Sequence, residues 1–307
     1  MQNFIFGKSD AMKLAMERLE KVIPTQMTVL FEGETGVGKT DLARYVHERS
    51  NQRHGPFMDM DVGAIPANLV ESELFGHEKG AFTGAEKTPI GLIEQADGGT
   101  LFLDEIHNLS YEVQTKYLKF LDHGTFRRVG GQKELRSCFR LIVATNENLE
   151  QRLAAGSFRR DLYFRLKQAT VVIPPLRERR EDILLLAEHY LQIYGAEFCK
   201  NVALSEAAKA LLLSYPWPGN IRELMNVLQE AVLHCNNGVL QPEDFALKMR
   251  RNALVVTEKK NGLSLEEIER QYIEIVLAST NGNVMQACKI LRIDRSTLYR
   301  KIKNNGM

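Results

Sequence analysis

A glycine-rich segment near the amino terminus has the residue types and spacing that hold phosphate. Residues 33–40 lie between an apolar run and a helical pattern over residues 41–49. Glycines in such a loop let backbone N–H groups close around phosphate oxygens at a helix N-terminus. Lys39 would then reach the β and γ phosphates, and the Thr40 hydroxyl would ligate Mg²⁺. The motif predicts a nucleotide site made by Gly33, Glu34, Thr35, Gly36, Val37, Gly38, Lys39 and Thr40.

Two carboxylates follow a second apolar run, in residues 98–105. Asp104 would hold the water shell of Mg²⁺, and Glu105 would orient and polarise the attacking water, because phosphoryl transfer depends on positioning and charge stabilisation. Gly99, in the same segment, is grouped with the nucleotide-binding residues. By itself an Asp-Glu pair after a strand is usually a surface turn; beside a phosphate loop it predicts ATP hydrolysis with Mg²⁺.

The elements that must position these residues follow from the hydrophobic pattern. Short apolar runs at residues 28–31, 57–60, 100–103 and 141–144 alternate with helical patterns, which predicts an α/β fold with a buried parallel sheet. Helical periodicity then covers residues 181–249. The predicted divisions are an α/β ATPase core over 1–173, a helical lid over 174–250, a solvated linker over 251–263 and a DNA-binding domain over 264–307.

The composition limits the class of protein. The 307 residues are 44% hydrophobic and carry 40 basic against 39 acidic side chains, a net charge of +1, so nucleic-acid binding requires a local basic patch. The four cysteines show neither zinc-site nor disulfide-framework spacing. No signal-like or membrane-spanning run is present, so we expect a cytoplasmic protein without membrane contact.

The carboxyl-terminal segment has the spacing of a helix-turn-helix. Helical patterns over residues 265–278, 284–291 and 294–304 are separated by a turn at 280–283. Six basic residues and one acid lie between positions 289 and 303. A basic surface helix without DNA is the alternative, but the pattern favours double-stranded DNA as the ligand. The predicted DNA-binding residues are Arg295, Ser296, Thr297, Tyr299 and Arg300 on the outward face, with Lys301 and Lys303 for phosphates.

Residues 80–85, Gly-Ala-Phe-Thr-Gly-Ala, resemble the signature loop of sigma-54-dependent transcription activators of the AAA+ superfamily. From composition alone, this loop is either a mobile contact with an apolar tip or a hairpin that buries Phe82. The resemblance implies contact with the sigma-54 subunit of RNA polymerase through Gly80, Ala81, Phe82, Thr83, Gly84 and Ala85. Residues 124–131 resemble the companion loop of the family.

Further positions match the same family. Thr145 and Asn146 resemble the first sensor motif, although a polar cap on a strand is the commoner role of such residues. Residues 156–166 resemble the arginine-finger segment, which implies that Arg159 and Arg165 act on a neighbouring subunit's nucleotide; without the resemblance they form a solvated helix face. Residues 217–224 resemble the second sensor motif, with Arg222 approaching the phosphates from the lid.

Two positions depart from the family pattern. Thr40 stands where many members have Glu. Asp61 stands where many members have an Asn that hydrogen-bonds the catalytic Glu and couples it to the signature loop, as a nucleotide switch. Two ionised carboxylates cannot share a hydrogen bond, so Asp61 would have to be protonated, bridged by water or turned away from Glu105.

The resemblance extends from about residue 6 to residue 306 and implies an AAA+ core, a helical lid and a Fis-type helix-turn-helix. It implies an ATP-driven activator that binds an enhancer-like DNA site, assembles from dimers to a hexamer and remodels sigma-54 polymerase to the open complex. The alternatives are another AAA+ protein remodeller and a DNA-binding repressor with a non-hydrolysing AAA+ scaffold. No regulatory domain is predicted before the core, so either a partner protein controls the activity in trans or the natural protein is longer than this sequence.

Overall fold

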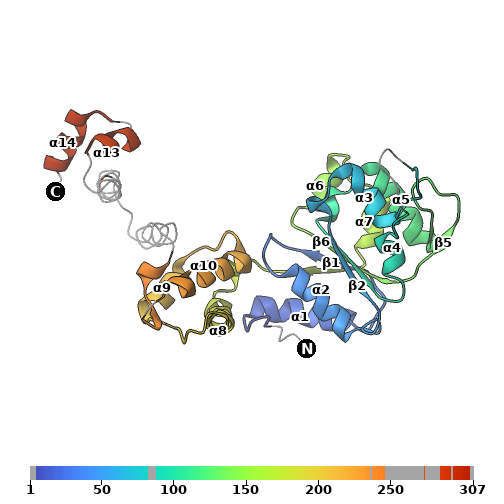
Figure 1. Ribbon diagram of the computed structural model, residues 1–307, viewed down its shortest axis with the longest axis horizontal. Helices are drawn as coiled ribbons and strands as arrows, with labels where there is room; N and C mark the ends of the chain where they lie inside the picture. Colours follow the sequence, from blue (N-terminus) through green and yellow to red (C-terminus); the bar gives the residue numbers. More distant parts are fainter. Residues whose placement is uncertain are drawn as a thin grey trace. The chain divides into compact units, whose positions relative to one another are not determined.

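Five short segments of the chain line up as a parallel sheet in the order β2-β3-β6-β1-β7 (Figure 1). The strands are β1 (Val29–Glu32), β2 (Phe57–Asp61), β3 (Thr100–Asp104), β6 (Arg140–Thr145) and β7 (Ala169–Val172). The apolar runs of the sequence correctly predict the first four. β7 was not predicted, because it pairs with β1 at the edge of the sheet and only Val171 of its four residues is fully buried.

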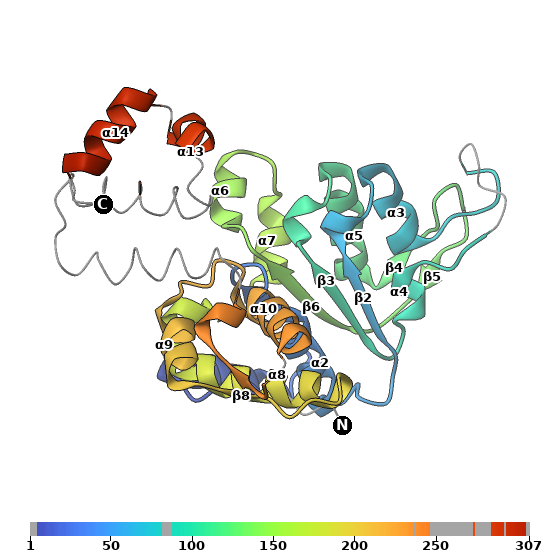
Figure 2. The same cartoon turned by 60° about the vertical axis from the view of Figure 1, so that its left-hand side comes forward.

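Side chains of the sheet alternate between two hydrophobic clusters, one on each face. Leu30, Leu101 and Val143 join one cluster. The helices that cover it are α3 (Ala67–Phe75), α4 (Leu92–Gln95), α5 (Tyr111–His123) and α7 (Arg160–Leu166). Phe31 and Phe102 join the other cluster, which α1 (Asp10–Val22) and α2 (Lys39–Arg49) cover. Figure 2 shows helices on both faces of the sheet. This alternation on strands buried from both sides is typical of α/β folds and confirms the predicted fold class.

The helices of this core begin where the sequence supplies caps. Side-chain hydroxyls of Ser9 and Ser110 accept hydrogen bonds from backbone N–H groups in the first turns of α1 and α5. The helical elements of the core are α1 (Asp10–Val22), α2 (Lys39–Arg49), η1 (Val62–Ala64), α3 (Ala67–Phe75), α4 (Leu92–Gln95), η2 (Ile106–Asn108), α5 (Tyr111–His123), α6 (Leu149–Ala154) and α7 (Arg160–Leu166). A small antiparallel pair, β4 (Thr125–Phe126) and β5 (Leu135–Arg136), follows α5.

The predicted lid is helical. It contains η3 (Leu176–Glu178), α8 (Arg180–Glu197), α9 (Glu206–Ser214), α10 (Asn220–His234) and η4 (Pro242–Asp244). Trp217, fully buried, donates its indole N–H to the Leu212 carbonyl at 2.9 Å, so this tryptophan is part of the lid core. A two-residue parallel pair, β8 (Ala203–Leu204) with β9 (Val239–Leu240), was not predicted, since two residues carry no periodicity.

The structure, a computed structural model, describes residues 5–81, 88–235, 237–245, 273, 284–291 and 293–304. Its contacts divide the chain into two units, Met1–Ala246 and Leu247–Met307. Core and lid belong to the first unit. In the second, α13 (Val284–Leu291) and α14 (Arg295–Asn304) match two predicted helices. Leu298 and Ile273 are buried together there. The predicted helix over 265–278, apart from Ile273, the turn at 280–283 and the linker at 251–263 lie outside the described residues. None of the described helices is long and apolar enough to cross a membrane.

Candidate functional site

The phosphate-binding loop lies at the carboxyl edge of the sheet, between β1 and the first turn of α2. Lys39 is buried, and its ammonium donates hydrogen bonds to the carbonyls of Gly33 at 2.9 Å and Glu34 at 3.1 Å. Burial lowers the pKa of Lys39, and the negative charges of Asp104 and Glu105 oppose that shift. The loop thus holds a desolvated cation ready for an anionic ligand.

A cavity of about 230 Å³ opens beside this loop. Its walls come from the loop, from the ends of β2 and β3, and from the lid: Thr35, Gly36, Gly38, Lys39, Thr40, Asp41, Asp61, Asp104, Glu105, Ile221, Arg222 and Met225. The structure therefore brings Lys39, Thr40, Asp104 and Glu105 together with the predicted lid arginine, Arg222. Two cations, Lys39 and Arg222, and four carboxylates line this single cavity, a set that suits a phosphorylated ligand bound with a divalent cation.

The oxygen groups of the cavity fit Mg²⁺. The Thr40 hydroxyl and the Asp104 carboxylate line the same space, and Mg²⁺ commonly takes one or two protein oxygens with the remainder from phosphates and water. Among the described residues, no group of three or more His, Cys, Asp or Glu side chains could hold a metal ion. Thr40 and Asp104 could thus hold one Mg²⁺ together with phosphate and water oxygens.

A second cavity of about 330 Å³ shares Gly38, Asp41 and Ile221 with the first. Apolar and aromatic side chains line it from three sides: Ile5 and Phe6 before α1, Val37 in the loop, Tyr190 and Ile193 on α8. Adjacent apolar and phosphate-binding spaces match the two ends of a nucleotide. The sequence motifs do not reveal this cavity, because its walls come from segments about 180 residues apart.

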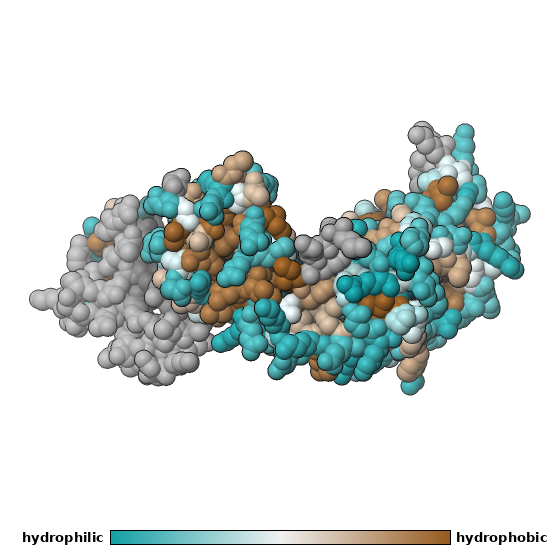
Figure 3. All heavy atoms as spheres, turned by 90° about the horizontal axis from the view of Figure 1, so that it is seen from below, coloured by the Kyte–Doolittle hydropathy of each residue, from teal (hydrophilic) through white to brown (hydrophobic). Residues whose placement is uncertain are grey.

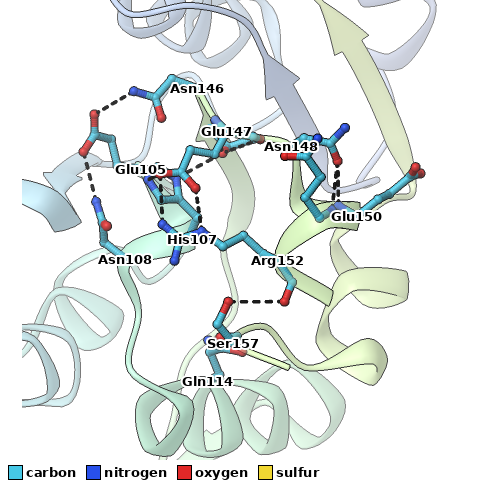
Figure 4. Close-up of polar contacts among 12 residues, drawn as sticks. Glu105, His107, Asn108, Gln114, Asn146, Glu147, Asn148, Glu150, Arg152 and Ser157 are labelled. Atoms are coloured by element: carbon cyan, nitrogen blue, oxygen red, sulfur yellow. Dashed lines mark hydrogen bonds and ion pairs between the residues drawn. The ribbon is translucent and has the colours of Figure 1, made fainter. Parts of the chain in front are cut away.

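The Glu105 carboxylate is held by two asparagine amides (Figure 4). Asn108 Nδ2 lies 3.0 Å from Oε2, and Asn146 Nδ2 lies 3.4 Å from Oε1. The Asn146 amide also donates to the Thr35 hydroxyl at 2.9 Å, which connects β6 to the phosphate loop. Glu105 has a left-handed backbone with φ 53°, a conformation that costs a non-glycine residue energy and often marks a functional site.

Three predicted site residues have other surroundings. Asp61 lines the phosphate cavity, but its Oδ1 accepts the Gly63 N–H at 2.9 Å. The buried Thr145 hydroxyl bonds to the Glu147 backbone and to His107, and Thr145 does not line the cavity. Gly99 precedes β3, at the edge of the sheet opposite the phosphate loop, where its carbonyl accepts the Arg140 N–H. The structure thus does not bring Gly99 to the cavity, because a whole strand separates it from Asp104.

The start of α10 bonds directly to the phosphate loop. Asn220 is buried and donates from Nδ2 to the Thr35 carbonyl at 3.0 Å and to Glu34 Oε2 at 3.1 Å. The Ile221 N–H donates to the Gly36 carbonyl at 2.9 Å. A Cβ at Gly36, where φ is +80°, would lie 2.4 Å from the Gly219 carbonyl oxygen, so the lid backbone approaches closely. Position 222, next along the helix, brings Arg222 into the cavity wall.

A salt bridge reinforces this contact between lid and loop. Arg177 Nη1 and Nη2 donate to the Glu34 carboxylate at 2.8 and 2.6 Å, and this pairing lowers the pKa of Glu34. Neither Arg177 nor Asn220 was predicted as a site residue. Asn220 lies inside the motif that carries Arg222. Its position at the start of a helix, directly after Gly219, was a sequence signal that could have identified it.

The two predicted arginine fingers lie away from the cavity of their own chain. Arg159 donates to the Asp161 carboxylate at 2.7 and 3.0 Å and to the Thr115 hydroxyl at 3.1 Å. Arg165 donates to the Leu121 carbonyl at 2.9 Å and keeps a side chain 46% exposed. Neither arginine lines the phosphate cavity of its own chain.

The base of the predicted contact loop is tied to its companion loop. Backbone hydrogen bonds join Glu78 N–H to the Val129 carbonyl at 3.0 Å and Val129 N–H to the Gly76 carbonyl at 2.9 Å. Arg128 forms salt bridges with Glu94 at 2.9 Å and Glu78 at 3.2 Å. Of the six predicted contact residues, Gly80 and Ala81 are described; Phe82, Thr83, Gly84 and Ala85 lie outside the described residues.

In the second unit, Asp294 caps α14. Its carboxylate accepts the Thr297 N–H at 2.8 Å and the hydroxyls of Ser296 and Thr297 at 2.5 and 2.9 Å, which lowers its pKa to about 2. The two hydroxyls thus serve the cap, whereas Arg295 is exposed. α14 also carries Tyr299, Arg300, Lys301 and Lys303.

Family profiles cover nearly the whole chain. Residues 5–172 match the "Sigma-54 interaction domain", residues 177–262 match the "AAA+ ATPase lid domain", and residues 264–304 match "Bacterial regulatory protein, Fis family". These three segments are the core, the lid and the segment that contains α13 and α14.

Curated proteins resemble the chain over its length. A "Signal-transduction and transcriptional-control protein" of Clostridium beijerinckii is 42% identical over 304 residues, which cover 97% of this chain and 48% of that protein. The alginate biosynthesis transcriptional regulatory protein AlgB of Pseudomonas aeruginosa is 41% identical over 97% of this chain and 67% of its own length. The regulatory protein AtoC of Escherichia coli is 38% identical over 99% and 68%. The chain thus spans about half to two thirds of these relatives.

Solved structures of NtrX from Brucella abortus have the same fold. The ADP complex has a TM-score of 0.74 at 30% identity, and covers 100% of this chain and 70% of NtrX. The ATP complex has a TM-score of 0.73 at 30% identity over the same shares. With the core profile matching more than half of its residues, the chain belongs to the sigma-54 interaction domain family of AAA+ ATPases with a Fis-type helix-turn-helix.

Proposed function

We propose that this chain is an ATP-hydrolysing transcription activator that binds DNA upstream of a promoter, assembles into a ring and remodels sigma-54 RNA polymerase to the open complex. One observation carries the catalytic part of this proposal. Lys39, Asp104 and Glu105 converge in one cavity that the lid closes on its far side. In the proposed roles, Lys39 and Arg222 bind phosphates, Thr40 and Asp104 hold Mg²⁺, and Glu105 orients the attacking water.

Mg²⁺ would offset charge on the phosphate oxygens while the residues of the chain position the reactants. The second cavity would take the base, because Phe6 and Tyr190 offer aromatic surface next to the phosphate loop. The placement of Asn146 between Thr35 and Glu105 supports a sensor role, since its amide contacts both the loop and the catalytic carboxylate.

Assembly is the second part of the proposal. Arg159 and Arg165 are held on the surface by carboxylates and carbonyls of their own chain, where a neighbouring subunit's nucleotide could compete for them. Exposed apolar side chains, including Ile193, Leu233 and Val239 of the lid, offer surface for such contacts, and Figure 3 shows apolar patches (brown) over this part of the chain. A dimer-to-hexamer ring would complete each site in trans.

Partner contacts form the third part. Phe82 and Thr83 lie in the loop whose base is tied to the companion loop through Val129, and we assign this loop to the sigma-54 subunit. The α13–α14 unit is assigned to double-stranded DNA, with Arg295 exposed at the start of α14 for base or phosphate contact. The proposed domain limits are 1–173, 174–250, 251–263 and 264–307, and a regulatory protein in trans remains part of the proposal.

The test compares ATP hydrolysis, DNA binding and open-complex formation in wild type, Glu105→Ala and Phe82→Ala, with Leu14→Ala as a control at an exposed apolar position on α1. Turnover per chain should rise with protein concentration, because the fingers act in trans. Glu105→Ala should abolish turnover, and Phe82→Ala should keep turnover but lose open-complex formation. Wild type that binds DNA and hydrolyses no ATP at any concentration would contradict the proposal and indicate a repressor with an AAA+ scaffold.

A further inference from the structure

The carboxylate of Glu105 depends on its neighbours for its orientation. Asn146 reaches Oε1 from β6 at 3.4 Å and is shared with Thr35, which lies in the phosphate loop. Asn108 reaches Oε2 at 3.0 Å and has no second partner among the side-chain hydrogen bonds of the described residues. A carboxylate oxygen accepts hydrogen bonds, so the atom that faces it must be the amide nitrogen of Asn108. Asn108 is therefore the closer of the two donors to Glu105, whereas Asn146 is shared with Thr35.

Asp61 borders the same space without being able to donate. A Cβ built on Gly63 would lie 2.3 Å from Glu105 Oε2, 2.9 Å from Asn108 Nδ2 and 3.3 Å from Asp61 Oδ1, so the three side chains converge on one point. The Asp61 carboxylate accepts the Gly63 N–H there, and an ionised carboxylate carries no proton for Glu105.

The backbone around Asn108 is suited to hold an orientation. Asn108 ends the single turn η2, and its N–H donates to the Glu105 carbonyl at 2.9 Å. The donor and the acceptor thus belong to one closed turn that begins at the left-handed backbone of Glu105. Few torsions separate the Asn108 amide from the carboxylate that it contacts.

We propose that Asn108 is the positioning residue of Glu105, and that it supplies from η2 the amide that position 61 lacks. Its hydrogen bond fixes Oε2, which leaves Oε1 toward Asn146 and the phosphate loop. This inference rests on the proposed function, since it assigns a partner to the same catalytic carboxylate. Asn108 does not line the phosphate cavity, so it acts through Glu105 and not through the nucleotide.

The experiment measures kcat and KM for ATP in wild type, Asn108→Ala, Asn108→Asp and the double variants that add Asp61→Asn. Loss of the amide should lower kcat about 10- to 100-fold while KM stays within about twofold, because a misplaced catalytic group costs turnover. Asp61→Asn should restore most of kcat in the Asn108→Ala background, since an asparagine there can accept the Gly63 N–H and still donate to Glu105. In the Asn108→Asp background less of kcat should return, because the new carboxylate still faces Glu105. Asn51→Ala, at an exposed turn position after α2, serves as the matched control.

The outcomes separate the inference from the function on which it rests. Wild type without ATP turnover overturns both. Wild type with turnover, together with Asn108→Ala and Asn108→Asp at wild-type kcat, overturns the inference alone. A fall in the kcat of Asn108→Ala that Asp61→Asn fails to restore also overturns it, because a loss that follows from folding alone does not respond to an amide placed at position 61. Asn108→Asp keeps the size of the side chain and covers the case in which the alanine variant folds poorly.

Discussion

At the scale of single residues, the site combines buried groups that carry charge with buried groups whose charged form is disfavoured by burial. His107 is of the second kind. It is almost fully buried behind Glu105, its Nδ1 lies 3.1 Å from the Thr145 hydroxyl, and its Nε2 lies 3.5 Å from Glu147 Oε1. Burial lowers the pKa of His107 below its ordinary value of 6.5, against the opposing attraction of Glu147. Burial also lowers the pKa of His47, the second buried histidine of the core.

This shift predicts how stability depends on pH. A histidine with a lowered pKa in the folded state binds fewer protons than the same histidine in the unfolded chain, so the free energy of unfolding falls as pH drops below about 6.5. His107→Asn, which keeps a hydrogen-bonding group near Thr145, should flatten this fall. Urea unfolding between pH 5 and 8 measures it, with the exposed His54→Asn as control. A pH dependence that is the same in His107→Asn and wild type would contradict the prediction.

At the scale of elements, a buried amide joins α5 to the finger segment before α7. Gln114 is fully buried and donates to the carbonyls of Leu109 at 2.9 Å and Ser157 at 3.1 Å, while its Oε1 accepts the Arg159 N–H at 2.8 Å. Leu109 follows η2, directly after the catalytic turn. One side chain therefore holds the turn after Glu105 and the backbone of a finger in fixed relation.

Gln114→Ala should remove all three hydrogen bonds. Each buried group left without a partner costs about 1–3 kcal/mol, so we expect a loss of at least that size in the free energy of unfolding. ATP turnover at saturating protein concentration should fall as well. Nucleotide affinity measured at low protein concentration should stay at the wild-type value, because Gln114 does not line either cavity. Lys119→Ala, exposed on the same helix, is the control. Unchanged unfolding in urea would show that the amide is dispensable.

How far the sequence could predict these elements depends on the kind of information each carries. Buried strands such as β3 and β6 appear as apolar runs, and α13 and α14 appear as periodic patterns. β7 lies at the edge of the sheet, and β8 and β9 have only two residues each, so these strands show no hydrophobic periodicity in the sequence. The motif residues Lys39 and Glu105 were predictable from spacing. Partners such as Asn108, Gln114 and Asn220 were not, because a polar residue in sequence does not reveal which carbonyl or carboxylate it will meet.

At the scale of the whole molecule, the first unit is a core and a lid joined at the phosphate loop. Asn220 receives the Leu176 N–H at 2.8 Å through Oδ1 and donates through Nδ2 to Thr35 and Glu34. It thus connects the start of the lid, the start of α10 and the loop. Lid and phosphate site cannot move independently while these hydrogen bonds persist.

Asn220→Ala should loosen this connection. The buried Leu176 N–H loses its partner, which costs about 1–3 kcal/mol in the free energy of unfolding. We also expect weaker binding of ADP and ATP, because the lid supplies walls to both cavities. Fluorescence titration with a labelled nucleotide measures the affinity, and Asn226→Ala, exposed on the same helix, is the control. Equal affinity in variant and wild type would mean that the lid is held by other contacts.

One of those other contacts between lid and phosphate loop does not depend on the identity of a side chain. The Ile221 N–H bonds to the Gly36 carbonyl through backbone atoms alone. Since every residue except proline has that N–H, almost any substitution at position 221 keeps the donor. A different side chain at this position would therefore change the wall of both cavities and keep the backbone hydrogen bond between lid and loop. A substitution at position 221 can thus change the fit of the ligand while the hydrogen bond between lid and phosphate loop persists.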